Sequence, residues 1–166
     1  MRLASNIQAT PATADADAGL PASRRLNLLL GEGAWRGDAL HDQLPGVLKP
    51  IGIDVLRAQS ARAAAQVAEQ IRIHIAVIDI SIPVDETHAV EAGQQVLQLL
   101  MRIPARPPVV VVRPPQPSQR ASARLLSDAL RGGAFAVLDR PLQLEAVLEV
   151  LRRVVQRHYA GMWRAG

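Results

Sequence analysis

The chain has 166 residues, 49% of them hydrophobic, which is enough to enclose one core but seldom two. It contains no cysteine, so a disulfide framework and a thiolate metal site are both excluded. The net charge is only +4 and aromatic residues make up 2%, so nothing indicates a stacking platform for nucleic acid. No apolar stretch reaches signal-peptide or membrane-spanning length, and we expect a cytoplasmic protein with no membrane contact.

The two ends of the chain differ in composition from the middle. Residues 1–24 are rich in Ala, Thr, Asp and Pro and show no hydrophobic periodicity by which a helix or strand could bury one face. We therefore expect a disordered N-terminal tail at 1–24, one domain at 25–160 and a short C-terminal end at 161–166.

The first part of the domain alternates apolar runs with helical patterns. An apolar run at 26–30 predicts a strand, and Gly31 and Gly33 after it predict a tight turn. Pro45 should kink or restart the helix that follows, and Ser60 is a candidate N-cap for the next one. In chain order we expect strand 26–30, helix 40–48, strand 53–56, helix 60–71 and strand 73–80.

The second part continues the alternation. A polar stretch at 84–89 leads to a helix with Val96 and Leu100 on its apolar stripe. The all-β-branched run 109–112 is typical of a strand covered on both faces, and Gly132-Gly133 is a candidate C-cap. In chain order we expect a helix around 96–100, strand 109–112, helix 123–130, strand 134–138 and helix 144–158.

Five strand–helix alternations predict an α/β fold with helices on both faces of a parallel sheet. In such folds the functional crevice lies beyond the carboxyl ends of the strands. Polar residues occur at four of these ends, namely Glu32, Asp79, Arg113 and Arg140. We expect these four side chains to converge on one crevice.

Two motifs resemble the receiver domain of two-component response regulators, of the chemotaxis-receiver kind. The segment 78–83, IDISIP, is similar to the phosphoacceptor strand of that family, and 133–141, GAFAVLDRP, is similar to its closing motif. The resemblance spans about 26–157. It implies a flavodoxin-like three-layer (βα)5 sandwich with a five-stranded parallel sheet in the order 2-1-3-4-5, and it places Asp79 at the phosphoacceptor position.

The chain departs from the receiver pattern at four of five functional positions. Glu32 stands alone where the family has two adjacent acids that help to hold Mg²⁺. Arg113 replaces a Ser or Thr, Arg140 replaces a lysine, and Val137 replaces an aromatic residue. Asp79 alone matches.

Charge counting suggests what these changes do. Glu32 and Asp79 face Arg113 and Arg140, so two negative and two positive groups could form a crevice ion-pair cluster without a metal. We therefore expect no cofactor, and Glu32 and Asp79 as the only ligands if Mg²⁺ binds after all. The alternative is that Asp79 is only a structural acid that pairs with Arg140.

The leading functional hypothesis is a stand-alone atypical receiver, or pseudo-receiver, that acts in signal transduction or transcription regulation. It would be no enzyme and would dock to a protein, either a sensor kinase or a regulated protein. The resemblance suggests docking through the face formed by the fourth helix, fifth strand and fifth helix, around 125–130 and 144–155. It suggests homodimerisation through the last helix and the strand before it. One alternative is a working phosphorelay receiver phosphorylated at Asp79, and a second is an RNA-linked antitermination regulator, which only charge supports. The roles of the tail and of residues 84–89 stay open.

Overall fold

A computed structural model describes residues 25–33 and 39–160; the tail expected at 1–24 and the end at 161–166 lie outside the described residues. Strands and helices alternate as expected. The strands are β1 Leu26–Gly31, β2 Ile53–Ala58, β3 Ile75–Asp79, β4 Val109–Arg113 and β5 Ala136–Asp139. The helices are α1 Ala39–Leu48, the 3-10 turn η2 Lys49–Ile51, α2 Ala61–Gln70, α3 Gly93–Arg102, α4 Gln119–Arg131 and α5 Leu144–His158. None of these helices combines the length and apolar character that crossing a membrane would require.

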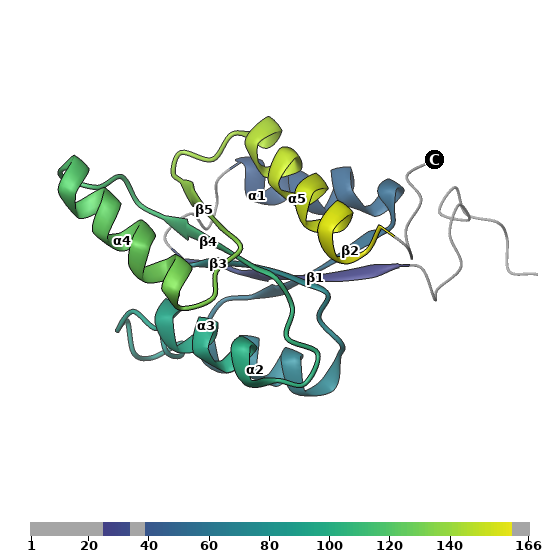
Figure 1. Ribbon diagram of the computed structural model, residues 1–166. Coiled ribbons are helices and arrows are strands. Elements are labelled where there is room, and N and C mark those ends of the chain that lie inside the picture. Colours follow the sequence, from purple (N-terminus) through teal and green to yellow (C-terminus); the bar gives the residue numbers. More distant parts are fainter. Residues whose placement is uncertain (1–24, 34–38, 161–166) are drawn as a thin grey trace, which may run out of the picture.

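The five strands form one parallel sheet in the order β2-β1-β3-β4-β5, which confirms the predicted topology. Helices α1 and α5 cover one face and α2 and α3 cover the other, while α4 lies on the β5 side of the sheet (Figure 1). All five strands point the same way, so their carboxyl ends form one edge of the molecule.

The core consists of two layers, because successive strand residues point to opposite faces of the sheet. Leu28, Leu30 and Val77 belong to the layer beneath α1 and α5. Leu29 and Ile78 belong to the layer beneath α2 and α3. This alternation continues to the strand ends and decides which face each functional side chain reaches.

Two details of the predicted helices need correction. The helix does not restart at Pro45, because α1 contains Pro45 as one helix. Proline lacks the N–H that would bond the carbonyl of His41, and Nη2 of Arg57 donates to that oxygen instead, at 2.7 Å. Helix α4 begins before the expected Ala123, because Ser118 caps it by accepting the N–H of Ala121 at 3.1 Å.

Two predicted caps are confirmed. Ser60 is the N-cap of α2, and its Oγ accepts the N–H of Ala63 at 3.0 Å. Gly132 is the C-cap of α4, and Gly133 follows it with φ +101°. A left-handed residue at this position costs glycine nothing, so the helix ends cleanly before β5.

Candidate functional site

Asp79 is the last residue of β3, and its side chain is fully buried. Oδ1 accepts two hydrogen bonds from Ser81, from the backbone N–H at 2.8 Å and from Oγ at 2.6 Å. Oδ2 has no hydrogen bond within the described part of the chain, and its nearest charged neighbour is Nε of Arg140 at 3.6 Å. The pairing expected between these two residues is therefore present.

Arg140 is held in place from the backbone. Its N–H donates to the carbonyl of Arg113 at 2.9 Å, which extends the pairing of β5 with β4 by one residue. Arg140 shares the face of Leu138, which packs in the layer beneath α1 and α5. Asp79 shares the face of Val77, in the same layer. The two side chains therefore meet on one side of the sheet.

The carboxylate is also covered by the loop after β1. A Cβ added to Gly33 would lie 2.5 Å from Oγ of Ser81 and 2.7 Å from Cγ of Asp79. The backbone of Gly33 therefore lies directly against Asp79, and only glycine allows this approach. Arg140 on one side and Gly33 on another leave the carboxylate no exposed surface.

Glu32 does not join this pair. Its carboxylate is buried, with 1% exposed, and Oε1 contacts Nε2 of His41 on α1. Nε of Arg57 on β2 lies 3.6 Å from the same oxygen. The backbone N–H of Glu32 bonds the carbonyl of Ala58 at 2.7 Å, so the residue extends the pairing of β1 with β2. Its partners come from that side of the sheet and not from β3.

Arg113 also departs from the expected cluster, because it points to the opposite face of the sheet. Val112 packs beneath α1 and α5, opposite Asp79 in the strand register, so the next residue faces α4. There the guanidinium contacts Asp139 through Nε and donates from Nη1 and Nη2 to O and Oγ of Ser122, at 2.6 and 2.7 Å. Arg113 fastens α4 to the sheet and does not reach Asp79.

The predicted crevice cluster of Glu32, Asp79, Arg113 and Arg140 is thus corrected to three separate groups. Asp79 pairs with Arg140, Glu32 pairs with a buried histidine and Arg57, and Arg113 pairs across the other face. Sequence reasoning missed His41 and Asp139 as partners. The alternation of side chains between the two faces of the sheet would have identified Asp139, because Arg113 on β4 and Asp139 on β5 are opposite one another in the strand register.

The sequence matches no protein-family model and no curated protein. Solved structures, in contrast, are closely similar in fold. A CheY-like response regulator receiver domain protein from Methanospirillum hungatei has 19% identity and a TM-score of 0.64, covering 82% of this chain and 98% of its own. The receiver domain of an HD domain-containing protein from Pseudomonas fluorescens has 15% identity and a TM-score of 0.62, covering 82% and 98%.

The non-phosphorylated HemR receiver domain from Leptospira biflexa adds a third match, with 19% identity, a TM-score of 0.61 and coverage of 79% of this chain and 94% of its own. The chain has the response-regulator receiver fold. Asp79 lies at the end of β3 in this fold, as its motif predicted.

The residues at this edge do not fit the magnesium ion that the receiver pattern implies. Mg²⁺ requires an octahedral shell of oxygen ligands, which proteins supply through one or two carboxylates that are open to the ion and its waters. Glu32 is committed to His41 and Arg57, and Arg140 lies beside the free oxygen of Asp79. Within residues 25–33 and 39–160, no group of three or more His, Cys, Asp or Glu side chains is placed to hold a metal ion.

Proposed function

We propose that this chain is an atypical receiver, a signalling module that acts by docking to another protein and not by Mg²⁺-dependent phosphorylation. One observation carries the proposal: the carboxylate at the phosphoacceptor position is buried against Arg140 and the backbone of Gly33. A buried acid with a permanent cation beside it is neutralised without any ligand.

The electrostatics of phosphoryl transfer support this. Transfer to a carboxylate requires a cation that neutralises the phosphoryl oxygens, together with room for three of them. The guanidinium of Arg140 cannot lose its proton, and it occupies the side of Oδ2, the only oxygen of Asp79 without a hydrogen bond. Arg113 offers no hydroxyl, and it faces away from Asp79. The site is therefore suited to a single, unphosphorylated state.

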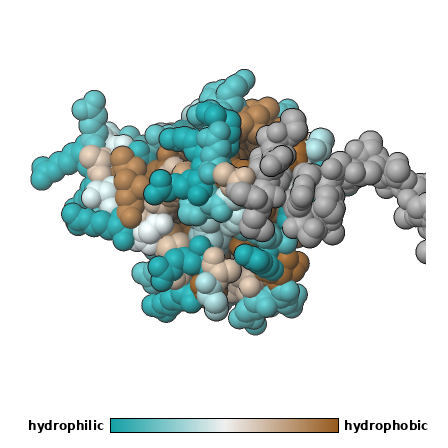
Figure 2. All heavy atoms as spheres, turned by 45° about the vertical axis from the view of Figure 1, so that its right-hand side comes forward, coloured by the Kyte–Doolittle hydropathy of each residue, from teal (hydrophilic) through white to brown (hydrophobic). Residues whose placement is uncertain are grey.

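The docking role is supported by apolar side chains that the described part of the fold leaves uncovered; Figure 2 shows hydrophobic surface among the hydrophilic side chains of one face. Leu126 and Leu130 of α4 are 38% and 48% exposed, on the side where β5 ends the sheet. We propose a protein partner, a sensor kinase or a regulated protein, in the cytoplasm, with homodimerisation through β5 and α5 as a variant of the same role. The module would catalyse no reaction of its own.

The test is treatment with a small phosphodonor and Mg²⁺, followed by intact-mass measurement. We expect no added phosphoryl group on the wild-type chain. Arg140→Lys, which restores the residue of the family pattern, is treated and measured in the same way. Arg152→Lys on the exposed face of α5 is its matched control. A phosphoryl group that appears on the wild type and disappears in Asp79→Asn would overturn the proposal in favour of a working phosphorelay receiver.

A further inference from the structure

The connection between β3 and α3 is built as a fixed projection. The backbone N–H of Val84 donates to the carbonyl of Val90 at 2.9 Å, and the N–H of Ala92 donates to the carbonyl of Ile82 at 2.8 Å, which closes the loop at its base. The start of α2 is joined to it. The N–H groups of Ala61 and Arg62 donate to the carbonyls of residues 83 and 84, at 2.8 and 3.0 Å.

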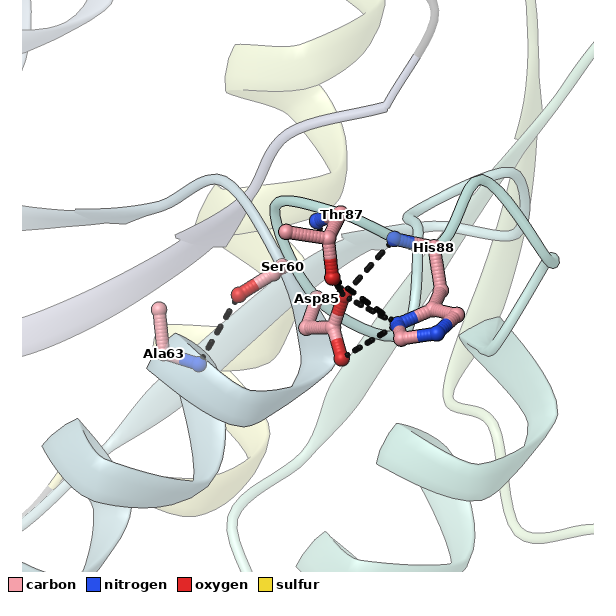
Figure 3. Close-up of polar contacts among 5 residues, drawn as sticks. All are labelled: Ser60, Ala63, Asp85, Thr87 and His88. Atoms are coloured by element: carbon pink, nitrogen blue, oxygen red, sulfur yellow. Dashed lines mark hydrogen bonds and ion pairs between the residues drawn. The ribbon is translucent and has the colours of Figure 1, made fainter.

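Asp85 organises the interior of this loop (Figure 3). Its Oδ1 accepts the backbone N–H groups of Thr87 and His88, at 2.8 and 2.7 Å, and the hydroxyl of Thr87 at 2.8 Å. Nδ1 of His88 lies 2.8 and 2.9 Å from the two carboxylate oxygens. Hydrogen bonds from His88 and Thr87 lower the pKa of Asp85 far below its usual range. The loop thus has a defined shape before any partner binds.

Three adjoining depressions surround Asp85, between α2, the loop and α3. Their volumes are about 330, 380 and 470 Å³. Arg62 lines the first two, and Glu86 lines the first and the third. We call this surface the α2–α3 groove. A groove of this size accommodates a few residues of an extended chain and is larger than a single side chain needs.

The walls of the α2–α3 groove combine apolar, amide and acidic surface. Val84 and Leu99 form an apolar part with the amide of Gln95 beside it, and the amide of Gln66 lines the adjoining depression together with Glu86. Glu86 is exposed and has no ion-pair partner among the described residues. Apolar area with a few convergent polar groups is typical of a binding site, and side-chain amides can bond the backbone of an extended peptide.

The local charge indicates which partner fits. The chain carries +4 overall, yet it has no lysine or arginine between Arg72 and Arg102, and the loop within this span contains Asp85, Glu86 and Glu91. The loop is therefore an acidic patch on a basic protein, and Arg62 of α2 is the one cation among the described residues that line the groove. Val90, beside it, is 66% exposed, the most exposed of the large apolar side chains in the described part. Acid next to apolar surface is complementary to a basic residue next to an aliphatic one.

We propose that the α2–α3 groove binds an extended segment of a partner protein in which an aliphatic residue stands next to Lys or Arg. The aliphatic side chain packs on Val84 and Leu99, and the cation lies at Glu86. The proposal rests on the docking role proposed above, and it places docking on the side of the sheet away from α5.

The experiment is selection of peptides from a displayed random library on the full chain, followed by affinity measurement with synthetic copies of the enriched peptides. We expect enrichment of an aliphatic residue adjacent to Lys or Arg. Leu99→Gln should weaken binding by about tenfold or more, because a polar group would replace the apolar contact. Glu86→Gln should weaken it by about three- to tenfold and reduce its dependence on salt. Glu69→Gln, an exposed acid at the other end of α2, is the matched control and should change nothing.

Three outcomes would overturn the proposal: no enrichment, enriched peptides without the basic–aliphatic pair, or peptides that Leu99→Gln and Glu86→Gln bind as well as the wild type does. Peptides whose binding depends on Leu130 instead would leave the docking role standing and remove only the α2–α3 groove. Phosphorylation of Asp79 would refute the proposed function regardless of where peptides bind, so the two failures are distinguishable.

Discussion

The pairing of Asp79 with Arg140 predicts a measurable coupling energy. Nε and Oδ2 are 3.6 Å apart, and the side chains are 16% and 0% exposed. At this separation and an effective dielectric constant of about 20, the attraction is about 4–5 kcal/mol before desolvation. Breaking a buried ion pair usually costs about 3–5 kcal/mol. Arg140 is partly reached by water and makes no hydrogen bond to the carboxylate, so we expect about 2–3 kcal/mol for Arg140→Gln.

The assay is a double-mutant cycle by urea unfolding. Asp79→Asn removes the charge but keeps an oxygen for Ser81, so it should cost about 1–2 kcal/mol. The double variant should cost little more than this, which gives a coupling of about 2 kcal/mol. The matched control is the exposed pair Glu149 and Arg152 on α5, whose coupling should be clearly smaller because water screens it. A coupling energy between Asp79 and Arg140 no larger than that of the control pair would refute the argument that Arg140 neutralises the buried carboxylate.

Three further predictions concern the frame around the site. Arg113→Met should lower the free energy of unfolding by about 2–3 kcal/mol in urea titrations, because its hydrogen bonds to α4 and β5 are lost while the apolar stem is kept; an unchanged midpoint would contradict this. Gly93→Ala should destabilise the protein by at least about 1–3 kcal/mol, because the added Cβ would lie 2.5 Å from the backbone of Ile80. Gly46→Ala, which has open space in α1, should be neutral or stabilising by up to about 1 kcal/mol. Equal shifts of the melting temperature in the two variants would refute the packing argument. Burial lowers the pKa of His74 below 6.5, and the neutral Nδ1 accepts the backbone N–H of Asn27 on β1. The free energy of unfolding contributed by His74 should therefore be fully present above pH 6.5 and should fall as the pH drops from there toward the lowered pKa. His74→Asn keeps a hydrogen-bond acceptor and should remove this pH dependence.

The strand ends and one of the contacts could be predicted from the sequence. Alternating apolar runs fix which residues leave each strand, and parallel strands bring those residues to one edge. Asp79 and Arg140 follow from this reasoning, and they do meet. The order of the strands needed the receiver resemblance, because alternation alone is compatible with more than one order.

The remaining partners depend on details that position along the chain does not give. Arg113 ends the same strand edge, but it is one residue beyond Val112, and the period of two sends it to the other face. Glu32 is on the same face of the sheet as Asp79. It does not join the pair of Asp79 and Arg140 because its carboxylate pairs with His41 of α1 instead. A histidine next to an apolar helix stripe carries no signal in the sequence until its buried acid is known.

These contacts give Asp79 a structural role that reaches the proposed groove. Its Oδ1 holds both the N–H and the hydroxyl of Ser81, which fixes the chain as it leaves β3. Two residues later the carbonyl of Pro83 accepts the first N–H of α2, and the α2–α3 groove begins. In Asp79→Asn the amide oxygen accepts these bonds without a negative charge, which makes them weaker. Loss of peptide binding in that variant, without loss of folding, would show that the acid at the phosphoacceptor position holds a docking surface in place.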